Sequence, residues 1–359
     1  MLKKYFFFGV IAALAVSCNT KFSVNGEYEE TPVVHFLLDQ GKDYQFMKLN
    51  KTFLEEGNAN EFAKDAEYSY FDNVEATVTE YVDNIETREW TLQDTVIQNK
   101  KDGVFYGPEQ KLYFFKVDAS NSAEKLNEDA VYQLNVNIDN GVHTVTGETS
   151  LVKGVSISYP QTNQSLNFAE NDVANNGYRS TPITFSKSNS APIYKLQMRF
   201  DYREYTSSSN EVKSILWNIG ESDNASATST SATISASGQQ FYEFVSANIT
   251  SNEDVVKREV DGFELILTAG SDDLYTYMLT NEPTSSLAQN QPTYSNVDGA
   301  LGIFSSRLTF TQYKASYTPP FTRALNQNST RELCNGQFTN TLKFCSPIPG
   351  DNTTSFACN

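Results

Sequence analysis

Hydrophobic and polar residues alternate along most of the chain, which is the pattern of strands that bury one face. Residues 132–138 and 194–203 alternate most regularly. In the first segment the polar positions are Gln133, Asn135 and Asn137. Units of strand, helix and parallel strand would give continuous apolar runs instead, so the alternation favours antiparallel sheet. The sequence predicts an all-β fold made of two antiparallel β-sandwich-like domains with a few short helices.

Turn residues separate these predicted strands. Asn140–Gly141 lies between residues 132–138 and 143–145 and tolerates the positive φ angles of a type I′ hairpin turn. Counting back from this turn pairs His143 with Ile138. The apolar run Val33–Leu38 ends at Asp39-Gln40-Gly41 and predicts an early strand.

Two short helices are expected within the second half. Ser237 and Gln240 form a capping box ahead of an apolar stripe that includes Phe241. Ser271-Asp272-Asp273 places acceptors and negative charge at a second helix start, and Pro283 ends that helix. We expect both helices to plug the open end of a sandwich with their apolar side chains in the core.

The pattern divides the chain into five parts, with a domain junction near Ser158–Gln161, where a strand pattern breaks at Pro160. Residues 221–238 are rich in Ser, Thr and Ala, and their first part is predicted to be a mobile loop. The five parts are a leader at 1–17, a polar tether at 18–32, the first sandwich-like domain at 33–158, a second β-rich domain with short helices at 159–322, and a cysteine-containing tail at 323–359.

The amino-terminal segment has the features of a secretory signal. Lys3 and Lys4 precede an apolar run over residues 5–15, and small residues follow at Ala15 and Ser17. Cys18 comes next, so the segment resembles a bacterial lipobox. This resemblance implies cleavage before Cys18 and acylation of the new terminus, which would anchor the protein in a lipid bilayer. The alternative is an ordinary signal with a chance cysteine. The apolar run is too short to span a bilayer, which takes ~20 apolar residues.

The net charge disfavours one class of partner. Without the leader, 25 basic residues face 44 acidic ones, a balance of −19. Nucleic acid is therefore disfavoured as a partner, because phosphate binding needs cationic groups. An acidic surface also repels an anionic bilayer, so attachment depends on the lipid. The charge serves solubility or a cationic ligand, and both interpretations stay open.

Three cysteines lie in the tail, at Cys334, Cys345 and Cys358. In an oxidising envelope they can form one disulfide in any of three pairings and leave one thiol over. Cross-linking to a partner and free thiols are the alternatives. Their spacing, without a nearby histidine, does not match a zinc site.

The sequence points to no catalytic residue, cofactor or metal ligand. The mature chain has two histidines, His35 and His143, both expected to be structural. No nucleophile elbow, zinc-protease motif, phosphate-binding glycine loop or dinucleotide fingerprint occurs. Two of the 44 carboxylates could hydrolyse a glycoside, but none is singled out. Trp90 and Trp217 could form a sugar-stacking platform, although core packing is the more common use.

Several segments resemble one family in their order and spacing. They are Asp39–Leu49, Asn73–Val78, residues 130–141, Tyr275-Thr276-Tyr277 and Pro292–Phe304. In these segments the chain resembles the Bacteroidota lipoproteins of the domain-of-unknown-function 4249 family, from about Val33 to Tyr317, without the tail. The resemblance implies an outer-membrane accessory lipoprotein associated with a TonB-dependent transporter, and it transfers no catalytic residues.

We therefore expect a non-enzymatic accessory or binding subunit, anchored through Cys18 in the outer membrane. The face of that membrane stays open. The segment near 221–236 and the tail are the expected contact regions. An envelope hydrolase acting on glycans or peptides is one alternative, and a structural or adhesive surface protein is another.

Overall fold

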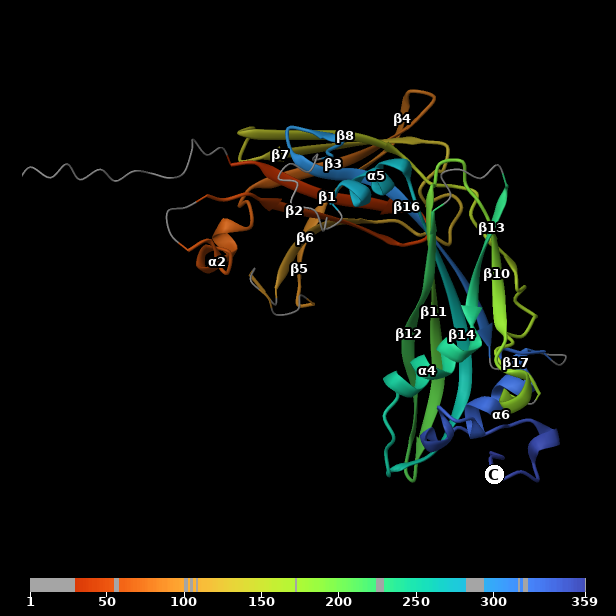
Figure 1. Ribbon diagram of the computed structural model, residues 1–359. Coiled ribbons are helices and arrows are strands. Elements are labelled where there is room, and N and C mark those ends of the chain that lie inside the picture. Colours follow the sequence, from red (N-terminus) through yellow and green to blue (C-terminus); the bar gives the residue numbers. More distant parts are fainter. Residues whose placement is uncertain are drawn as a thin grey trace, which may run out of the picture.

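A computed structural model describes residues 30–54, 58–99, 103, 106–107, 109–171, 173–223, 229–281, 294–315, 317–318 and 322–358. Eight strands form one long sheet in the order β12-β11-β14-β16-β1-β2-β6-β5, which runs through both halves of the molecule (Figure 1). These strands are β1 (Pro32–Asp39), β2 (Tyr44–Lys51), β5 (Gln93–Ile97), β6 (Gln110–Lys116), β11 (Ile193–Thr206), β12 (Asn210–Asp223), β14 (Val255–Gly270) and β16 (Leu301–Ala315).

Smaller sheets accompany the two halves of the long one. A five-stranded sheet has the order β15-β8-β7-β3-β4, and a three-stranded sheet has the order β13-β10-β9. The strands of the smaller sheets are β3 (Val74–Val82), β4 (Ile85–Thr91), β7 (Val131–Ile138), β8 (His143–Ser150), β9 (Ile157–Tyr159), β10 (Ser180–Ser186), β13 (Ser231–Ser237), β15 (Val297–Asp298), and the separate pair β17 (Tyr317–Thr318) and β18 (Thr322–Arg323).

Helices are short and concentrated in the second half. They are α2 (Ala59–Phe62), α3 (Val173–Asn176), α4 (Gly238–Asn248), α5 (Asp272–Asn281) and α6 (Gln327–Asn335), with the 3-10 helices η1 (Ala66–Tyr68), η2 (Asn340–Leu342) and η3 (Pro349–Asp351). Among the described residues, no helix combines the length and apolar character needed to cross a membrane. The fold is all-β with a few short helices, in agreement with the alternating sequence pattern.

The first sandwich packs the five-stranded sheet against β1, β2 and β6. Its core draws alternate residues from both layers, including Phe36, Met47, Val78, Leu134 and Phe115. β7 buries Tyr132, Leu134, Val136 and Ile138 and exposes Gln133 and Asn135 between them, as the alternation predicts. Burying one face of each sheet in this way removes apolar surface from water, which stabilises the sandwich.

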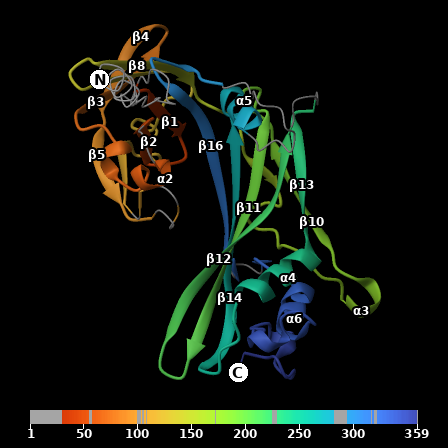
Figure 2. The ribbon, with the colours of Figure 1, turned by 60° about the vertical axis from the view of Figure 1, so that its left-hand side comes forward.

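The second sandwich packs β11, β12, β14 and part of β16 against the three-stranded sheet, α4 and the tail (Figure 2). β11 buries Tyr194, Leu196, Met198, Phe200 and Tyr202, which confirms the second alternating segment. Leu333 and Phe344 belong to this core, and the Phe344 ring lies 6.0 Å from that of Phe200. The tail is therefore a structural part of the second half.

β16 connects the two sandwiches. Its first part pairs in parallel with β1, from Val33 opposite Leu301 to Asp39 opposite Arg307. Its second part pairs antiparallel with β14. Gly302 has a φ of 111°, and a Cβ there would overlap the carbonyl oxygen of Val34. Only glycine permits this close approach of two strands. Val297 and Phe304 complete the first core, so that sandwich is not one continuous chain segment.

The predicted hairpin and helices form with one correction. Ile138 pairs with His143, and the Ser237 side chain caps α4 by accepting a bond from the amide of Gln240. α5 starts at Asp272 as predicted, but none of its residues is buried. It lies on the outer face of the sheet, where the His35 Nε2 and Tyr277 hydroxyl are 2.8 Å apart. The expectation that α5 plugs a core was therefore wrong, because its stripe contacts a sheet face and remains partly exposed.

The mobile loop predicted for the first part of residues 221–238 falls mostly on residues that the structure does not describe. Residues 221–223 end β12 and residues 231–237 form β13, in which Ile234 and Ala236 are buried. Small side chains fit here because β13 packs as an edge strand against the second core. Residues 224–228 lie outside the described part of the chain.

Candidate functional site

The outer face of the five-stranded sheet is hollowed and polar. We call it the concave face; its hollow has a volume of about 640 Å³. The lining residues come from every strand of this sheet: Thr77, Thr79, Tyr81, Glu89, Gln133, Leu134, Asn135, Thr146, Gly147, Glu148, Asn296 and Asp298. A hollow of this size lies within the usual range of ligand sites, roughly 300–1,000 Å³.

Strand register places these side chains in two rows. In the first row, Glu89, Thr79, Gln133 and Glu148 lie opposite one another across β4, β3, β7 and β8. In the second row, Thr77, Asn135, Thr146 and Asp298 lie opposite one another across β3, β7, β8 and β15. Side chains two positions apart on a strand share a face, so both rows point outward.

The two rows differ in how their polar groups are used. In the first row, the Thr79 hydroxyl donates to Glu89 at 3.3 Å and the Gln133 amide donates to Glu148 at 3.2 Å. In the second row, the side chains have no hydrogen-bond partner among the described residues. Those donors and acceptors are available to a ligand.

Charge on the concave face has one sign. Glu89, Glu148 and Asp298 are exposed carboxylates, and the lining residues include no lysine, arginine or histidine. The face therefore favours neutral or cationic molecules and repels anions.

Hydrogen bonds fix the backbone that carries this face. Asn296 donates to the Phe304 carbonyl at 2.8 Å and accepts from its amide at 2.9 Å, which ties the β15 segment to β16. On the inner side of β3, Glu80 accepts from Arg88 at 2.9 Å and from the Tyr132 hydroxyl at 2.7 Å. Burial opposes ionisation of Glu80, but these hydrogen bonds hold its pKa below the ordinary value.

The two histidines lie away from the concave face. His35 contacts Tyr277 beneath α5, and burial, with Lys48 nearby, lowers its pKa. His143 packs beside Phe71, and its Nε2 lies 3.7 Å from Glu30. Each therefore has a packing role in its own sheet, as the sequence suggested.

Both tryptophans pack against the cores, Trp217 buried and Trp90 half-buried. Trp90 stacks with Phe115 at a centroid distance of 5.0 Å, and Trp217 is 7% exposed against Phe244. Neither forms a sugar-stacking platform. The preference for core packing is confirmed, because both rings face inward from their strands.

Of the predicted cysteine sites, Cys18 lies outside the described residues, and the structure pairs Cys345 with Cys358. This is one of the three pairings that the sequence left open. Cys334 is a buried free thiol, and burial raises its pKa to about 12, so the unreactive protonated form prevails. The Glu259 carboxylate lies near both disulfide sulfurs. A disulfide supplies no thiolates, so this cluster is not a metal centre in the oxidised protein.

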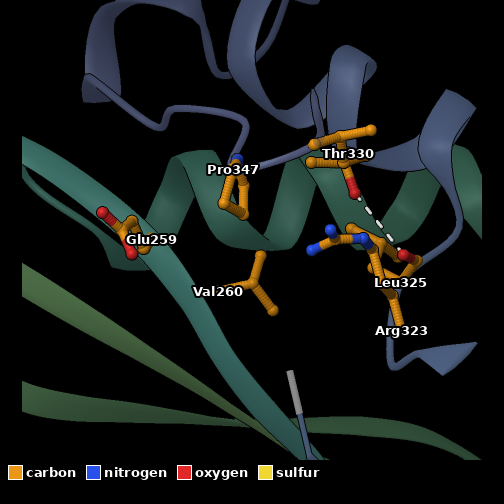
Figure 3. Close-up of a pocket in the computed structure, with 7 residues that line it drawn as sticks. Glu259, Val260, Arg323, Leu325, Thr330 and Pro347 are labelled. Atoms are coloured by element: carbon orange, nitrogen blue, oxygen red, sulfur yellow. Dashed lines mark hydrogen bonds between the residues drawn. The ribbon is translucent and has the colours of Figure 1, made fainter. Parts of the chain in front are cut away.

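A smaller cavity of about 180 Å³ lies between β14 and the tail (Figure 3). Glu259 lies at one side and Arg323 at the other, with Val260 and Pro347 between them. The Thr330 hydroxyl donates to the Leu325 carbonyl within its wall. The volume suits a few water molecules, at roughly 30 Å³ each, and not an extended ligand.

An exposed aromatic patch lies at the far end of β2 and β6. We define it as Tyr44, Phe46 and Phe114, whose ring centroids lie 5.8–6.0 Å apart. Tyr44 and Phe46 are 47% and 43% exposed, and the Lys116 ammonium lies 5.5 Å from the Tyr44 ring centroid. Exposed aromatic clusters of this kind are typical of protein contact surfaces.

Sequence reasoning identified only the centre of the concave face. It assigned Gln133, Asn135 and Asn137 to the wet side of one strand. Thr77, Thr79 and Asp298 lie far from that strand in sequence, and only sheet order brings them together. The polar alternation within residues 74–82 was the local signal that could have extended the site.

Comparisons with known proteins provide no family. No family model matches the chain, and no curated protein matches it. Among solved structures that match the chain, the likeness is weak. The FN1–FN3 domains of chicken CNTN1 match with TM-score 0.19, 11% identity and coverage of 68% of this chain and 61% of that one.

The C-terminal globular domain of an oligosaccharyltransferase from Pyrococcus abyssi gives TM-score 0.18, 10% identity and coverage of 59% and 42%. CBD12 from CALX1.2 gives TM-score 0.18, 9% identity and coverage of 79% and 98%. The chain spans less than two thirds of the first two of these structures. At these TM-scores the likeness carries no argument about function.

Proposed function

We propose that the protein is a lipid-anchored, non-enzymatic binding or accessory subunit of the outer membrane that works with a TonB-dependent transporter. The leader and Cys18 support the anchor, and the resemblance of the chain to accessory lipoproteins supports the partner. The concave face supplies a surface on which a ligand can be held for transfer.

The composition of the concave face is the observation that carries this proposal. Its lining residues offer amides, hydroxyls and carboxylates, without histidine, cysteine or a basic group. Such a lining can orient a polar ligand through many weak contacts. Tolerance for many hydroxyl and amide contacts is what a binding surface requires.

The anchor is tested by mass spectrometry of the mature protein from native membranes. We expect an acylated Cys18 at the amino terminus. The Cys18→Ala variant should leave the membrane fraction, because each buried CH₂ of an acyl chain contributes about 0.8 kcal/mol to membrane binding. An unmodified terminus elsewhere in the chain contradicts the anchor.

The partner is tested by affinity purification of the tagged, full-length protein from native membranes. We expect a TonB-dependent barrel to copurify with it. We take the aromatic patch as a candidate contact surface for the barrel. Phe46→Ser should lower recovery of the barrel, because it removes an exposed apolar ring from this patch. Leu216→Ser is the matched control, since Leu216 is 50% exposed on the second sandwich. Recovery of the wild-type protein without a barrel contradicts the proposed partnership.

A hydrolase is the second candidate, and the three carboxylates of the concave face are the observation that favours it. Two carboxylates are enough to cleave a glycosidic bond when they flank it. Incubation of the protein with polymer substrates tests this possibility. Turnover that Glu148→Gln or Asp298→Asn abolishes would replace the binding proposal with an enzymatic one.

A further inference from the structure

We propose that the concave face binds a neutral oligosaccharide laid across β3, β7 and β8. This inference rests on the proposed function, because it names the class of ligand that the same surface takes. Its first argument is hydrogen-bond chemistry. A sugar hydroxyl both donates and accepts, and the lining offers both kinds of partner in two parallel rows.

The second row provides the strongest contacts for such a ligand. The Asn135 amide can donate to one sugar oxygen while its carbonyl accepts from the neighbouring hydroxyl. Thr146 and Asp298 lie opposite it on the next two strands. Adjacent strands are about 4.8 Å apart, so one row presents polar groups at regular steps to a repeating polymer.

Charge narrows the class of sugar. The three carboxylates accept hydrogen bonds from hydroxyl groups, and the lining contains no cation to neutralise an acidic ligand. Uronic acids, sulfated glycans and phosphates are therefore repelled. Neutral hexose or pentose polymers meet no such cost.

Tyr81 adds an apolar contact at the end of β3. Its half-buried ring offers a flat apolar surface beside the hydroxyl and carboxylate groups of Thr79 and Glu89. Sugar rings have an apolar face of C–H groups and a polar rim, so they need both kinds of contact. The aromatic ring and the polar rows together match this amphipathic character.

A cationic ligand fits the face less well. Seven neutral polar residues line the hollow beside only three carboxylates. Two of these carboxylates, Glu89 and Glu148, already accept hydrogen bonds from neutral neighbours. Hydrogen bonds to neutral groups are far less sensitive to salt than ion pairs, so ionic strength distinguishes the two classes.

The test uses the complete mature lipoprotein in detergent. An array of neutral and acidic oligosaccharides identifies a ligand, and calorimetric titration then measures its affinity at low and high salt. We expect binding to a neutral oligosaccharide with little salt dependence. Asn135→Ala should weaken it about tenfold, since tenfold corresponds to about 1.4 kcal/mol and Asn135 can make two hydrogen bonds.

Gln197→Ala is the matched control. Gln197 is an amide-bearing residue on the outer face of the long sheet, where it donates to Asn218. We expect its affinity for the oligosaccharide to equal that of the wild type. Thermal unfolding of both variants checks their folding, and Thr146→Ala provides a second test of the same row if Asn135→Ala does not fold.

Three outcomes overturn the inference. They are no binding to any neutral oligosaccharide, an affinity of both the Asn135→Ala and Thr146→Ala variants equal to that of the wild type, and binding to cationic polymers alone that is lost at high salt. Failure of the inference is separable from failure of the proposed function. Recovery of a barrel without sugar binding contradicts only the proposed class of ligand. Sugar binding without recovery of a barrel contradicts only the proposed partner.

Discussion

The two sandwiches use their polar residues in different ways. On the outer face of the second, charges neutralise one another, with Arg199 paired to Asp201 at 2.8 Å and Arg203 paired to Asp261 at 2.9 Å. On the concave face of the first, carboxylates have no cationic partner, and Asn135 has no hydrogen-bond partner among the described residues.

This difference suggests that polar groups in the second sandwich stabilise the fold, whereas those on the concave face of the first are available for binding. In the second sandwich the buried Arg258 links β14 to β11 and to the tail, and the buried Lys314 links β16 to the segment at 160–164. A disulfide closes a loop within the tail. In the first sandwich the polar groups on the concave face remain available to a ligand. Substitutions in the second half should therefore affect stability, and substitutions on the concave face should affect binding.

The largest effect is expected from Arg258→Ala in the second sandwich. Arg258 is 1% exposed and donates to Glu204 at 2.9 Å and to the Thr250 carbonyl at 3.0 Å. Removing it leaves buried acceptors unpaired, so the free energy of unfolding should fall by about 3–5 kcal/mol. Urea unfolding measures this value. Arg203→Ala, on the exposed face, is the control and should cost less than about 1 kcal/mol.

Loss of the disulfide should have the next largest effect. Cys345 and Cys358 are separated by 13 residues, and breaking their bond frees the closed loop in the unfolded chain. The Cys345→Ser/Cys358→Ser double variant should lose about 3 kcal/mol of unfolding free energy while keeping its ligand affinity. Cys334→Ser is the comparison for a thiol that forms no bond. Equal stability of the double variant and the wild type would show that the tail does not brace the second half.

Lys314 gives the second sandwich a pH dependence. It is 1% exposed, its ammonium donates to the Gln164 carbonyl at 3.1 Å, and burial lowers its pKa from 10.5 to about 8. Between these pH values the unfolded chain binds the proton and the folded protein does not, so stability should rise with pH. The rise is at most about 1.4 kcal/mol per pH unit. Unfolding of the wild type and of Lys314→Met across this window isolates it, and parallel curves for the two proteins would contradict it.

The smallest stability effect is expected on the concave face. Asn135 is exposed and has no hydrogen-bond partner among the described residues, so Asn135→Ala should change the free energy of unfolding by less than about 0.5 kcal/mol. The same variant should lose ligand affinity. A large loss of stability in chemical unfolding would mean that the second row of the concave face stabilises the fold and does not form a binding site.

Local pattern predicted the strands well because alternation follows directly from burying one face. It predicted β7, β11 and the cap of α4 with their faces. It failed for α5, whose stripe Leu274, Tyr277 and Met278 has helical spacing but rests on a sheet surface. Spacing shows that a helix has two faces, and it does not show what covers them.

The return of the chain to the first sandwich could not be predicted in this way. β16 pairs with β1, more than 260 residues earlier in the chain, and this pairing depends on the backbone contact between Gly302 and Val34. The concave face has the same origin, since Thr77, Asn135 and Asp298 meet only through sheet order. Non-local pairing leaves almost no trace in the local pattern of either strand.

The central claim, that the concave face binds the ligand, is tested most directly by labelling carboxylates with a carbodiimide in the complete protein. A saturating neutral oligosaccharide should protect Glu89, Glu148 and Asp298 and leave labelling of Asp261 and Glu264 unchanged. Unchanged labelling of the first three carboxylates, or protection confined to the second sandwich, would contradict the account.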